Sequence, residues 1–300
     1  MAKFRSNHER GKYSVVGGSV KLGLALILLV LLFFITRPLI GRFFEIGSPE
    51  QYQEKAATDV YFLPVSKGVD VYRHHHFYLG YDEEMEQAAW VAYELTTTQL
   101  NAKKVSRTDF FSEDPIIESG SSHYEDYRGS GYTKGHLVPA ADRAFSREAM
   151  DETFLMSNIS PQEYHFNSGI WRELEELTRD WARSNEQLYI YAGPIFPKKG
   201  IKRIGRNQVA VPEAFYKILV DASEPDMKGI GFIVPNTSSE EPLTRYMVTI
   251  DAVEDIVGIN FNSQLFTSSL EDSIESKFNQ YDWPIDQVRF KKRIEEWNRR

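Results

Sequence analysis

The sequence predicts an α+β fold in which helices flank a central antiparallel sheet. Short runs rich in β-branched and aromatic residues have turn-forming residues at their boundaries, which is typical of strands. These runs cover residues 188–192, 215–220, 230–234 and 246–250. An amphipathic helix is predicted to begin at Asn167. We expect one domain, because 42% hydrophobic and 13% aromatic residues supply a full core and argue against disorder.

The helix predicted from Asn167 has two different faces. At about 100° per residue, four apolar side chains gather within roughly 60° of one another. They are Ile170, Leu174, Leu177 and Trp181. On another side, Asn167, Glu175 and Arg179 fall within roughly 120°. The first face is typical of a core contact, and the second presents an amide, a carboxylate and a guanidinium. A solvated helix has the same pattern, so the helix alone does not identify a site.

Other segments predict local structure without chemistry. A second helix is expected near residues 83–95, where five residues recur at helical spacing. They are Met85, Ala88, Ala89, Ala92 and Tyr93. Residues 120–131 are rich in turn formers and predict a mobile loop. The acidic stretch 271–275 is interpreted as a solvated surface.

The run from Tyr132 to His136 supplies the first candidate catalytic residue, and Asn167 follows thirty-one positions after the histidine. A neutral imidazole can deprotonate water near neutral pH, so His136 is the candidate general base. Gly135 before it is consistent with a close approach of the backbone. The chain contains no cysteine, which excludes a thiol nucleophile and cysteine-ligated zinc.

Three motifs around these residues resemble the DNA/RNA non-specific endonuclease family. They are GYTKGHLVPAADR at 131–143, SNISPQ at 157–162 and FNSGIWRELE at 166–175. Their order and spacing match the family, and the resemblance extends over roughly residues 58 to 285. It implies the ββα-metal (His-Me finger) nuclease fold, in which the histidine lies on a strand and the metal-binding asparagine opens the crossing helix. It also implies metal-dependent hydrolysis of DNA and RNA that leaves 5′-phosphates.

The resemblance implies a role for each candidate. Asn167 would be the direct protein ligand of Mg²⁺, with Mn²⁺ as the alternative metal, because hard cations prefer oxygen ligands. Glu175 would orient metal-bound water, and Arg179 would stabilise the phosphate as charge develops. Asn158 would position the histidine or metal-bound water. Arg107 is assigned to the same site.

The chain departs from the family at one place. The family usually has Asp-Arg-Gly-His where this chain has Thr133, Lys134, Gly135 and His136. One carboxylate is therefore lost, and Lys134 can neutralise a phosphate but cannot bind it bidentately. The reaction class still follows, because the base, the metal ligand and the helix carboxylate remain. The competing hypothesis is a non-catalytic nucleic-acid-binding module that retains the nuclease fold, and a delivered or defensive toxin nuclease is a third.

A basic cluster predicts where a polyanion would bind. The formal net charge is −8, but a local basic surface matters more for encounter than the total. The cluster lies in a predicted loop between Phe196 and strand-like residues 208–211. Its members are Lys198, Lys199, Lys202, Arg203 and Arg206. Contact with DNA or RNA and a solvated loop explain it equally well. No Gly-rich phosphate loop with its lysine occurs, so no nucleotide cofactor is expected. The oligomeric state stays open, a homodimer included.

Three consecutive histidines, His74, His75 and His76, suggest a metal site at first sight. Consecutive residues on a strand point to alternate faces, so they cannot converge on one ion without distortion. A metal role is therefore not expected there.

An uncharged run from Leu22 to Thr36, bounded by Lys21 and Arg37, predicts a membrane anchor. Its fifteen residues rise only about 22 Å as a helix, short of a hydrocarbon core near 30 Å, so flanking basic stems must snorkel or the bilayer must thin. A cleaved signal peptide and a buried core helix are the alternatives. An uncleaved anchor is favoured, because no small-x-small cleavage pattern is clear after Phe34.

More basic residues precede this run than follow it, which predicts a single-pass protein of a bacterial-type inner membrane. Its N-terminus would be cytoplasmic and its nuclease domain extracytoplasmic. The predicted parts are a basic N-terminus (1–21), a transmembrane anchor (22–40), a juxtamembrane linker (41–57), an endonuclease domain (58–290) and a charged C-terminal tail (291–300).

Overall fold

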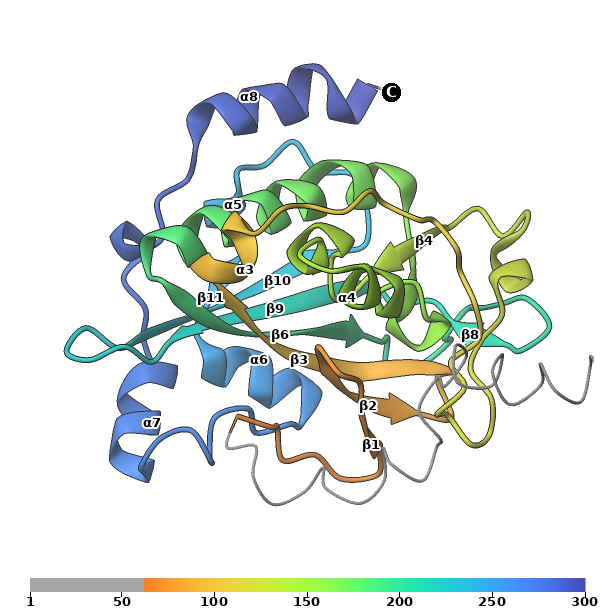
Figure 1. Ribbon diagram of the computed structural model, residues 1–300, viewed down its shortest axis with the longest axis horizontal. Coiled ribbons are helices and arrows are strands. Elements are labelled where there is room, and N and C mark those ends of the chain that lie inside the picture. Colours follow the sequence, from red (N-terminus) through yellow and green to blue (C-terminus); the bar gives the residue numbers. More distant parts are fainter. Residues whose placement is uncertain (1–61, 300) are drawn as a thin grey trace, which may run out of the picture. The chain divides into compact units, whose positions relative to one another are not determined.

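The computed structural model describes residues 62–299. Within them, a seven-stranded antiparallel sheet has the order β1-β2-β3-β6-β9-β10-β11 (Figure 1). Its strands are β1 Asp70–Arg73, β2 Tyr78–Asp82, β3 Gln87–Thr96, β6 Gln187–Ile195, β9 Ala214–Asp221, β10 Lys228–Pro235 and β11 Met247–Val248. Two smaller sheets pair β4 Thr133–His136 with β5 Ile159–Gln162, and β7 Arg203–Ile204 with β8 Val209–Ala210. The predicted α+β class with a large antiparallel sheet is confirmed.

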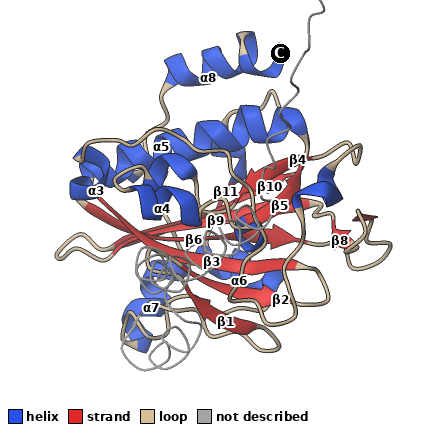
Figure 2. Ribbon diagram, turned by 45° about the vertical axis from the view of Figure 1, so that its right-hand side comes forward, coloured by secondary structure: helices blue, strands red, loops and turns tan. Residues whose placement is uncertain are grey.

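Helices cover both faces of the large sheet. Figure 2 shows α3, α4 and α5 on one face, with α6 and α7 on the other. The α-helices are α3 Thr97–Asn101, α4 Arg147–Glu152, α5 Arg172–Ser184, α6 Ile250–Val257, α7 Ser268–Glu275 and α8 Gln287–Glu295. Short 3-10 turns are η1 Tyr124–Tyr127, η2 Ala140–Arg143, η3 Met156–Asn158, η5 Leu243–Tyr246, η6 Gln280–Asp282 and η7 Trp297–Arg299, and η4 Phe166–Trp171 is a π-helical turn.

Three of the four predicted runs are strands of the large sheet, namely β6, β9 and β10. In the fourth run only Met247 and Val248 pair, and Ile250 begins α6. Thr249 ends the extended segment because its hydroxyl accepts a hydrogen bond from Ala252 N at 3.1 Å, which caps the helix.

The helix predicted near residues 83–95 is wrong, since this segment turns and then forms β3, an interior strand of the large sheet. Both faces of β3 are buried, so its sequence lacks the alternation of a half-exposed strand. Its register also shifts, because Gly80 pairs with Trp90 whereas Tyr81 pairs with Ala88. The extra residue, Ala89, is a β-bulge that breaks the two-residue period. Without a two-residue period, the spacing of the alanines in this segment led to the wrong prediction of a helix.

The apolar stripe of the other predicted helix is confirmed, because Ile170, Leu174, Leu177 and Trp181 are all buried in the core against the sheet. The helical segment begins before Asn167, at Tyr164. Glu163 caps it, since its carboxylate accepts a hydrogen bond from Phe166 N at 2.8 Å. The π-helical turn at 166–171 replaces the regular helix expected there, so steps of four do not stack across it.

The predictions for the N-terminal anchor and the C-terminal tail have different outcomes. The predicted anchor and linker lie outside the described residues, and among residues 62–299 no helix has the length and apolar character needed to cross a membrane. Residues 291–299, expected in a charged tail, complete α8 and η7. Arg293 and Trp297 there are buried, and Arg293 forms an ion pair with Glu173 at the start of α5.

Two further local predictions need correction. Glu275, expected on a solvated surface, is buried and accepts a hydrogen bond from Asn262 Nδ2 at 2.6 Å. Residues 120–131, expected to be a plain loop, contain the 3-10 turn η1. The carboxylate of Asp126 in this turn accepts hydrogen bonds from the backbone and side chain of Asn207, between β7 and β8. The basic β7–β8 loop is thereby fixed against the segment that leads into β4.

Candidate active site

The candidate site is built from two strands and the helical segment that follows them. β4 pairs with β5, placing Thr133 opposite Gln162 and His136 opposite Ile159. Gly135 lies between them, and a Cβ there would sit 2.0 Å from Gln162 Cδ. Gln162 is fully buried, so its side chain has no room to withdraw. Glycine is therefore required at position 135 because a Cβ would collide with the Gln162 side chain. The sequence had suggested a close approach of the backbone instead.

His136 is held in an aromatic pocket. Its ring lies 4.9 Å from that of Phe154 and 5.7 Å from that of Phe111, between centroids. Burial and, to a smaller extent, repulsion from Arg107 lower the pKa of His136 to about 3, although Asp109 opposes the shift. The imidazole is therefore neutral at physiological pH. Its Nε2 is buried and has no hydrogen-bond partner among the described residues. A neutral imidazole carries one unprotonated ring nitrogen, which can accept a proton.

Asn158 is fully buried, and its side chain contacts the backbone of Val138, two residues after His136. Its Oδ1 accepts a hydrogen bond from Val138 N at 2.9 Å, and its Nδ2 donates to Val138 O at 3.0 Å and to Thr153 O at 2.9 Å. Its backbone oxygen accepts a further bond from Leu137 N at 3.0 Å. The side chain therefore fixes the backbone directly after His136. Its polar atoms are engaged with protein groups rather than turned toward a metal.

Asn167 is oriented by the first residue of β4. Its Nδ2 donates a 2.9 Å hydrogen bond to Thr133 Oγ1, and the same hydroxyl donates to Gln162 O at 2.9 Å. Because the hydroxyl hydrogen is used toward Gln162, Thr133 must act as the acceptor for Asn167. This assigns the orientation of the Asn167 amide and leaves Oδ1 as its acceptor.

Glu175 and Arg179 lie one turn apart on α5 in a charged cluster. Arg179 Nη1 forms an ion pair with Asp142 Oδ1 at 2.9 Å, and Tyr93 donates to Asp142 Oδ2 at 2.8 Å. Burial raises the pKa of Glu175 to about 7, while Lys217 and Arg179 act against that rise. Because burial removes the Glu175 carboxylate from water, a cation bound beside it would stabilise its charged form.

Lys217 was not predicted as a site residue. It lies in the middle of β9, is fully buried, and its Nζ has no hydrogen-bond partner among residues 62–299. The Nζ is 5.1 Å from the centroid of the Trp171 ring. Burial lowers its pKa, whereas the charge of Glu175 raises it. One signal was present in the sequence, since Lys217 interrupts an otherwise apolar strand. Asp142 lies within the first motif but was given no role.

Arg107 and Lys134 flank the aromatic pocket of His136. Arg107 Cζ lies 4.9 Å from the centroid of the Phe154 ring, and its Nε bonds Asp109 Oδ1 at 2.6 Å. Lys134 Nζ lies 4.9 Å from the centroid of the Phe111 ring. The structure thus places two cations around the candidate base.

A pocket of about 460 Å³ opens beside β4. Its lining includes Tyr124, Tyr132, Thr133 and Lys134. Lys202 of the basic cluster reaches its wall, with Nζ 4.6 Å from the centroid of the Tyr132 ring and 3.4 Å from the hydroxyl. The pocket therefore combines aromatic faces with positive charge next to the candidate base.

The residues present suit a hard divalent cation. Asn167 offers an amide oxygen whose orientation is fixed by Thr133, and Glu175 offers a desolvated carboxylate. Oxygen donors of this kind, few in number, match Mg²⁺, which retains several of its own waters.

Comparison with known proteins decides the family. The model of the DNA/RNA non-specific endonuclease family matches residues 56–268. The chain belongs to this family. Human mitochondrial endonuclease G is 35% identical over 198 residues, which cover 62% of this chain and 67% of the relative. Mitochondrial nuclease EXOG of Xenopus laevis is 34% identical over 233 residues, covering 73% of this chain and 65% of the relative.

The fold agrees with this assignment. A chain in the crystal structure of the EndoG/EndoGI complex aligns with a TM-score of 0.63 at 28% identity, covering 73% of this chain and 93% of that chain. As a family member with nuclease relatives, the chain is a hydrolase that acts on nucleic acids, in a family that depends on a divalent metal. The resemblance seen in the sequence motifs is confirmed.

Proposed function

We propose that this chain is a Mg²⁺-dependent endonuclease that cleaves DNA and RNA with little sequence preference, with His136 as the general base. The observation that carries the proposal is the buried, neutral imidazole of His136, whose Nε2 has no partner in the described part of the chain. It lies on β4, and the first residue of the same strand orients Asn167. Base and metal ligand therefore belong to one ββα unit.

The residues divide the chemistry among themselves. The His136 imidazole accepts the proton of the attacking water, and Asn158 fixes the backbone that carries the ring. Asn167 would hold the metal directly and Glu175 through water, and the metal would supply charge neutralisation at the phosphate. Arg179 keeps one guanidinium nitrogen on Asp142. Its remaining donors stabilise charge that develops on the phosphate.

Substrate binding without sequence preference follows from the surroundings of β4. Lys134 and Arg107 neutralise phosphates near His136, and Lys134 does so as a point charge that cannot bind a phosphate bidentately. Tyr124 and Tyr132 in the adjacent pocket offer aromatic faces on which any base can stack. Lys202, at the pocket wall, extends the positive surface toward the β7–β8 loop.

The test is cleavage by the purified full-length chain of supercoiled plasmid and of single-stranded RNA. Mg²⁺, Mn²⁺ and Ca²⁺ are compared with chelator alone. We expect cutting of both substrates with Mg²⁺ and none with chelator, and products that T4 ligase can rejoin without prior kinase treatment, which shows 5′-phosphates. A folded chain that binds DNA but never cuts with any of these metals would instead be a binding module that retains the nuclease fold.

We also propose that residues 22–40 anchor the chain in a membrane, with residues 1–21 in the cytoplasm and the nuclease domain on the opposite side. The support is the uncharged run from Leu22 to Thr36 and the excess of basic residues before it. The test is alkaline carbonate extraction of membranes, followed by protease protection with an epitope at the N-terminus. Recovery in the soluble fraction would overturn the anchor, and proteolysis of the epitope from the outside would overturn the orientation.

A further inference from the structure

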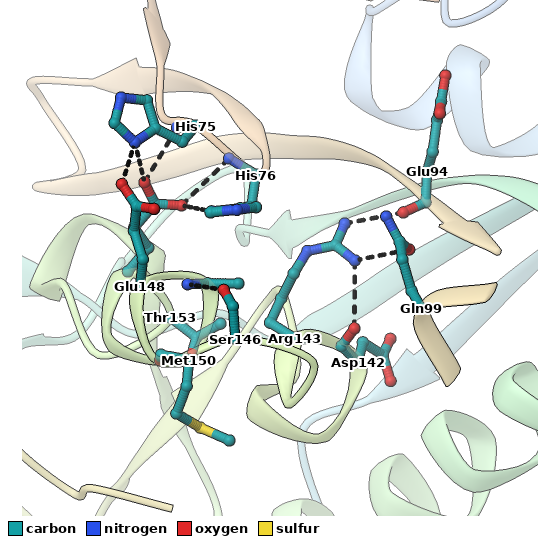
Figure 3. A network of polar contacts seen from close by, with 12 residues as sticks. His75, His76, Glu94, Gln99, Asp142, Arg143, Ser146, Glu148, Met150 and Thr153 are labelled. Carbon is teal, nitrogen blue, oxygen red and sulfur yellow. Dashed lines mark hydrogen bonds and ion pairs between the residues drawn. The ribbon is translucent and has the colours of Figure 1, made fainter. Parts of the chain in front are cut away.

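A second cluster of metal-binding side chains lies outside the nuclease site. One ligand atom each from His75, Glu148 and Glu152 lies within 4.8 Å of the others. His76 contacts one member of the group, since its Nδ1 is 2.8 Å from Glu152 Oε2. In Figure 3 the His75 ring lies above the Glu148 carboxylate, and His76 lies to the right of it.

The backbone explains how neighbouring histidines converge. Residues 74–77 form the turn between β1 and β2 and are not part of a strand, so the expected alternation of faces does not apply. Glu152 accepts hydrogen bonds from the backbone N–H groups of His75 at 3.0 Å and of His76 at 3.1 Å, which fixes the turn against α4. His74 points elsewhere, to Asp114 in the interior at 3.0 Å.

α4 presents the two carboxylates on one side. Glu148 and Glu152 are four residues apart, and side chains at that spacing lie above one another on a helix. His75 Nδ1 contacts Glu148 Oε1 and lies 3.7 Å from Glu152 Oε1. One imidazole nitrogen and two carboxylates therefore converge across the gap between the turn and the helix, and His76 contacts the other oxygen of Glu152.

The donor set selects the metal. Mg²⁺ and Ca²⁺ prefer oxygen ligands, whereas Zn²⁺ combines imidazole nitrogen with carboxylate oxygen in a four-ligand shell. The same contacts could be ion pairs without a metal. The side chains of the His75–Glu148 pair are at least half exposed, and exposed pairs of this kind contribute little to stability. The carboxylate cluster of Asp251, Glu254 and Glu275 lacks nitrogen donors and serves as a contrast.

We propose that His75, Glu148 and Glu152 form a Zn²⁺ site that joins the β1–β2 turn to α4, with His76 orienting the Glu152 carboxylate and water as the fourth ligand. The site is separate from the metal site of the nuclease. Its position matters because α4 leads directly into Thr153 and Phe154. Thr153 O accepts a bond from Asn158, and the Phe154 ring contacts His136. Zn²⁺ would therefore stabilise the wall against which the nuclease base packs.

The test is a Zn²⁺ titration of the purified, metal-stripped full-length chain against a chromophoric chelator. Glu148→Gln is the first variant, because the Glu148 side chain is 60% exposed and its loss does not threaten folding. His75→Ala is the second, and Asp251→Asn is the matched control. We expect one zinc equivalent whose affinity falls roughly tenfold or more in each cluster variant and is unchanged in the control.

A second readout separates a metal site from ion pairs. Zn²⁺ that binds the folded state raises the melting temperature of the wild type and of Asp251→Asn, and raises it much less in Glu148→Gln. The variants keep their Mg²⁺-dependent nuclease rate in zinc-free buffer, because no cluster residue belongs to that machinery. Equal zinc affinity in the wild type and both cluster variants would overturn the proposal, as would the absence of binding at micromolar zinc.

Discussion

Thr133 and Asn167 are joined by a 2.9 Å hydrogen bond from the asparagine amide to the threonine hydroxyl. Thr133 stands where family members usually have aspartate, so in this chain a neutral hydroxyl orients the amide of Asn167, the proposed metal ligand. Thr133 is itself fixed by Gln162 O. The amide orientation therefore does not require a carboxylate at this position.

The first prediction tests that contact. Thr133→Val preserves the shape of the side chain but removes the hydroxyl, so the Asn167 amide loses its partner. We expect the Mg²⁺ concentration for half-maximal cleavage to rise about 10- to 100-fold, the usual effect of losing a group that orients a ligand. Thr133→Ser keeps the hydroxyl and should stay close to the wild type. Equal metal dependence of the valine and serine variants would show that the contact does not matter.

The second prediction concerns Lys217, whose buried charge acts on Glu175. Lys217→Met removes a cation from beside the Glu175 carboxylate and from the surroundings of the phosphate site. We expect the cleavage rate at saturating Mg²⁺ to fall by about 100-fold, as when a preorganised stabilising charge is removed. The matched control is Lys228→Met, since Lys228 also lies near a tryptophan, Trp283, but pairs with Asp221 at 3.5 Å. A normal rate in Lys217→Met would leave this lysine a purely structural role.

The third prediction is a pH dependence of stability. Burial raises the pKa of Glu275 to about 8 and that of Glu254 to about 7, both above the unfolded value of 4.5. The folded state therefore binds more protons than the unfolded state between about pH 4.5 and 8, so stability falls as pH rises through that range. Glu275→Gln keeps an acceptor for Asn262 but cannot ionise. It should increase the free energy of unfolding by about 2 kcal/mol at pH 8.5 and have little effect at pH 4.5.

Urea unfolding of the wild type and Glu275→Gln at both pH values measures this difference. Glu240→Gln is a suitable control, because Glu240 is exposed and does not contribute to the raised pKa of Glu275 or Glu254. A gain from Glu275→Gln that is equal at both pH values would show that packing, and not ionisation, accounts for it.

The fourth prediction concerns the C-terminal helix. Arg293 pairs with Glu173 and also donates to the backbone oxygens of Ser239 and Glu241. Arg293→Met leaves the buried Glu173 carboxylate and the Glu241 carbonyl without this partner, while Ser239 O keeps the bond from Asn298 Nδ2 at 2.8 Å. The loss should cost about 3–5 kcal/mol of unfolding free energy. The double variant with Glu173→Gln removes the stranded charge and should recover part of that loss. Chemical denaturation of the single and double variants gives the coupling between the two residues, and no recovery in the double variant would contradict it.

The parts of the fold that sequence reasoning predicted are those with one dominant local signal. β9 and β10 are dense in β-branched and aromatic residues, and α5 has an apolar stripe of regular period. β3 has neither signal, because it is buried on both faces and a bulge at Ala89 breaks its period. Propensity alone then favours helix, since alanine is the best helix former, and tertiary burial overrides it.

The candidate site shows the same division. His136, Asn167 and Glu175 could be named because the motifs that contain them resemble those of the endonuclease family. Lys217 and Asp142 could not be given roles, since they come from different elements and meet α5 only in the folded chain. The convergence of His75 and His76 was missed because a strand was assumed where the chain turns.

The central claim is that His136 performs the chemistry and Asn167 holds the metal. The most direct measurement compares His136→Ala and Asn167→Ala with the wild type in plasmid cleavage at several Mg²⁺ concentrations, with DNA affinity measured in parallel. We expect both variants to lose cleavage by about 1000-fold or more while DNA affinity changes little, because phosphate contacts come from other residues. Cleavage by folded His136→Ala at the wild-type rate would contradict the account.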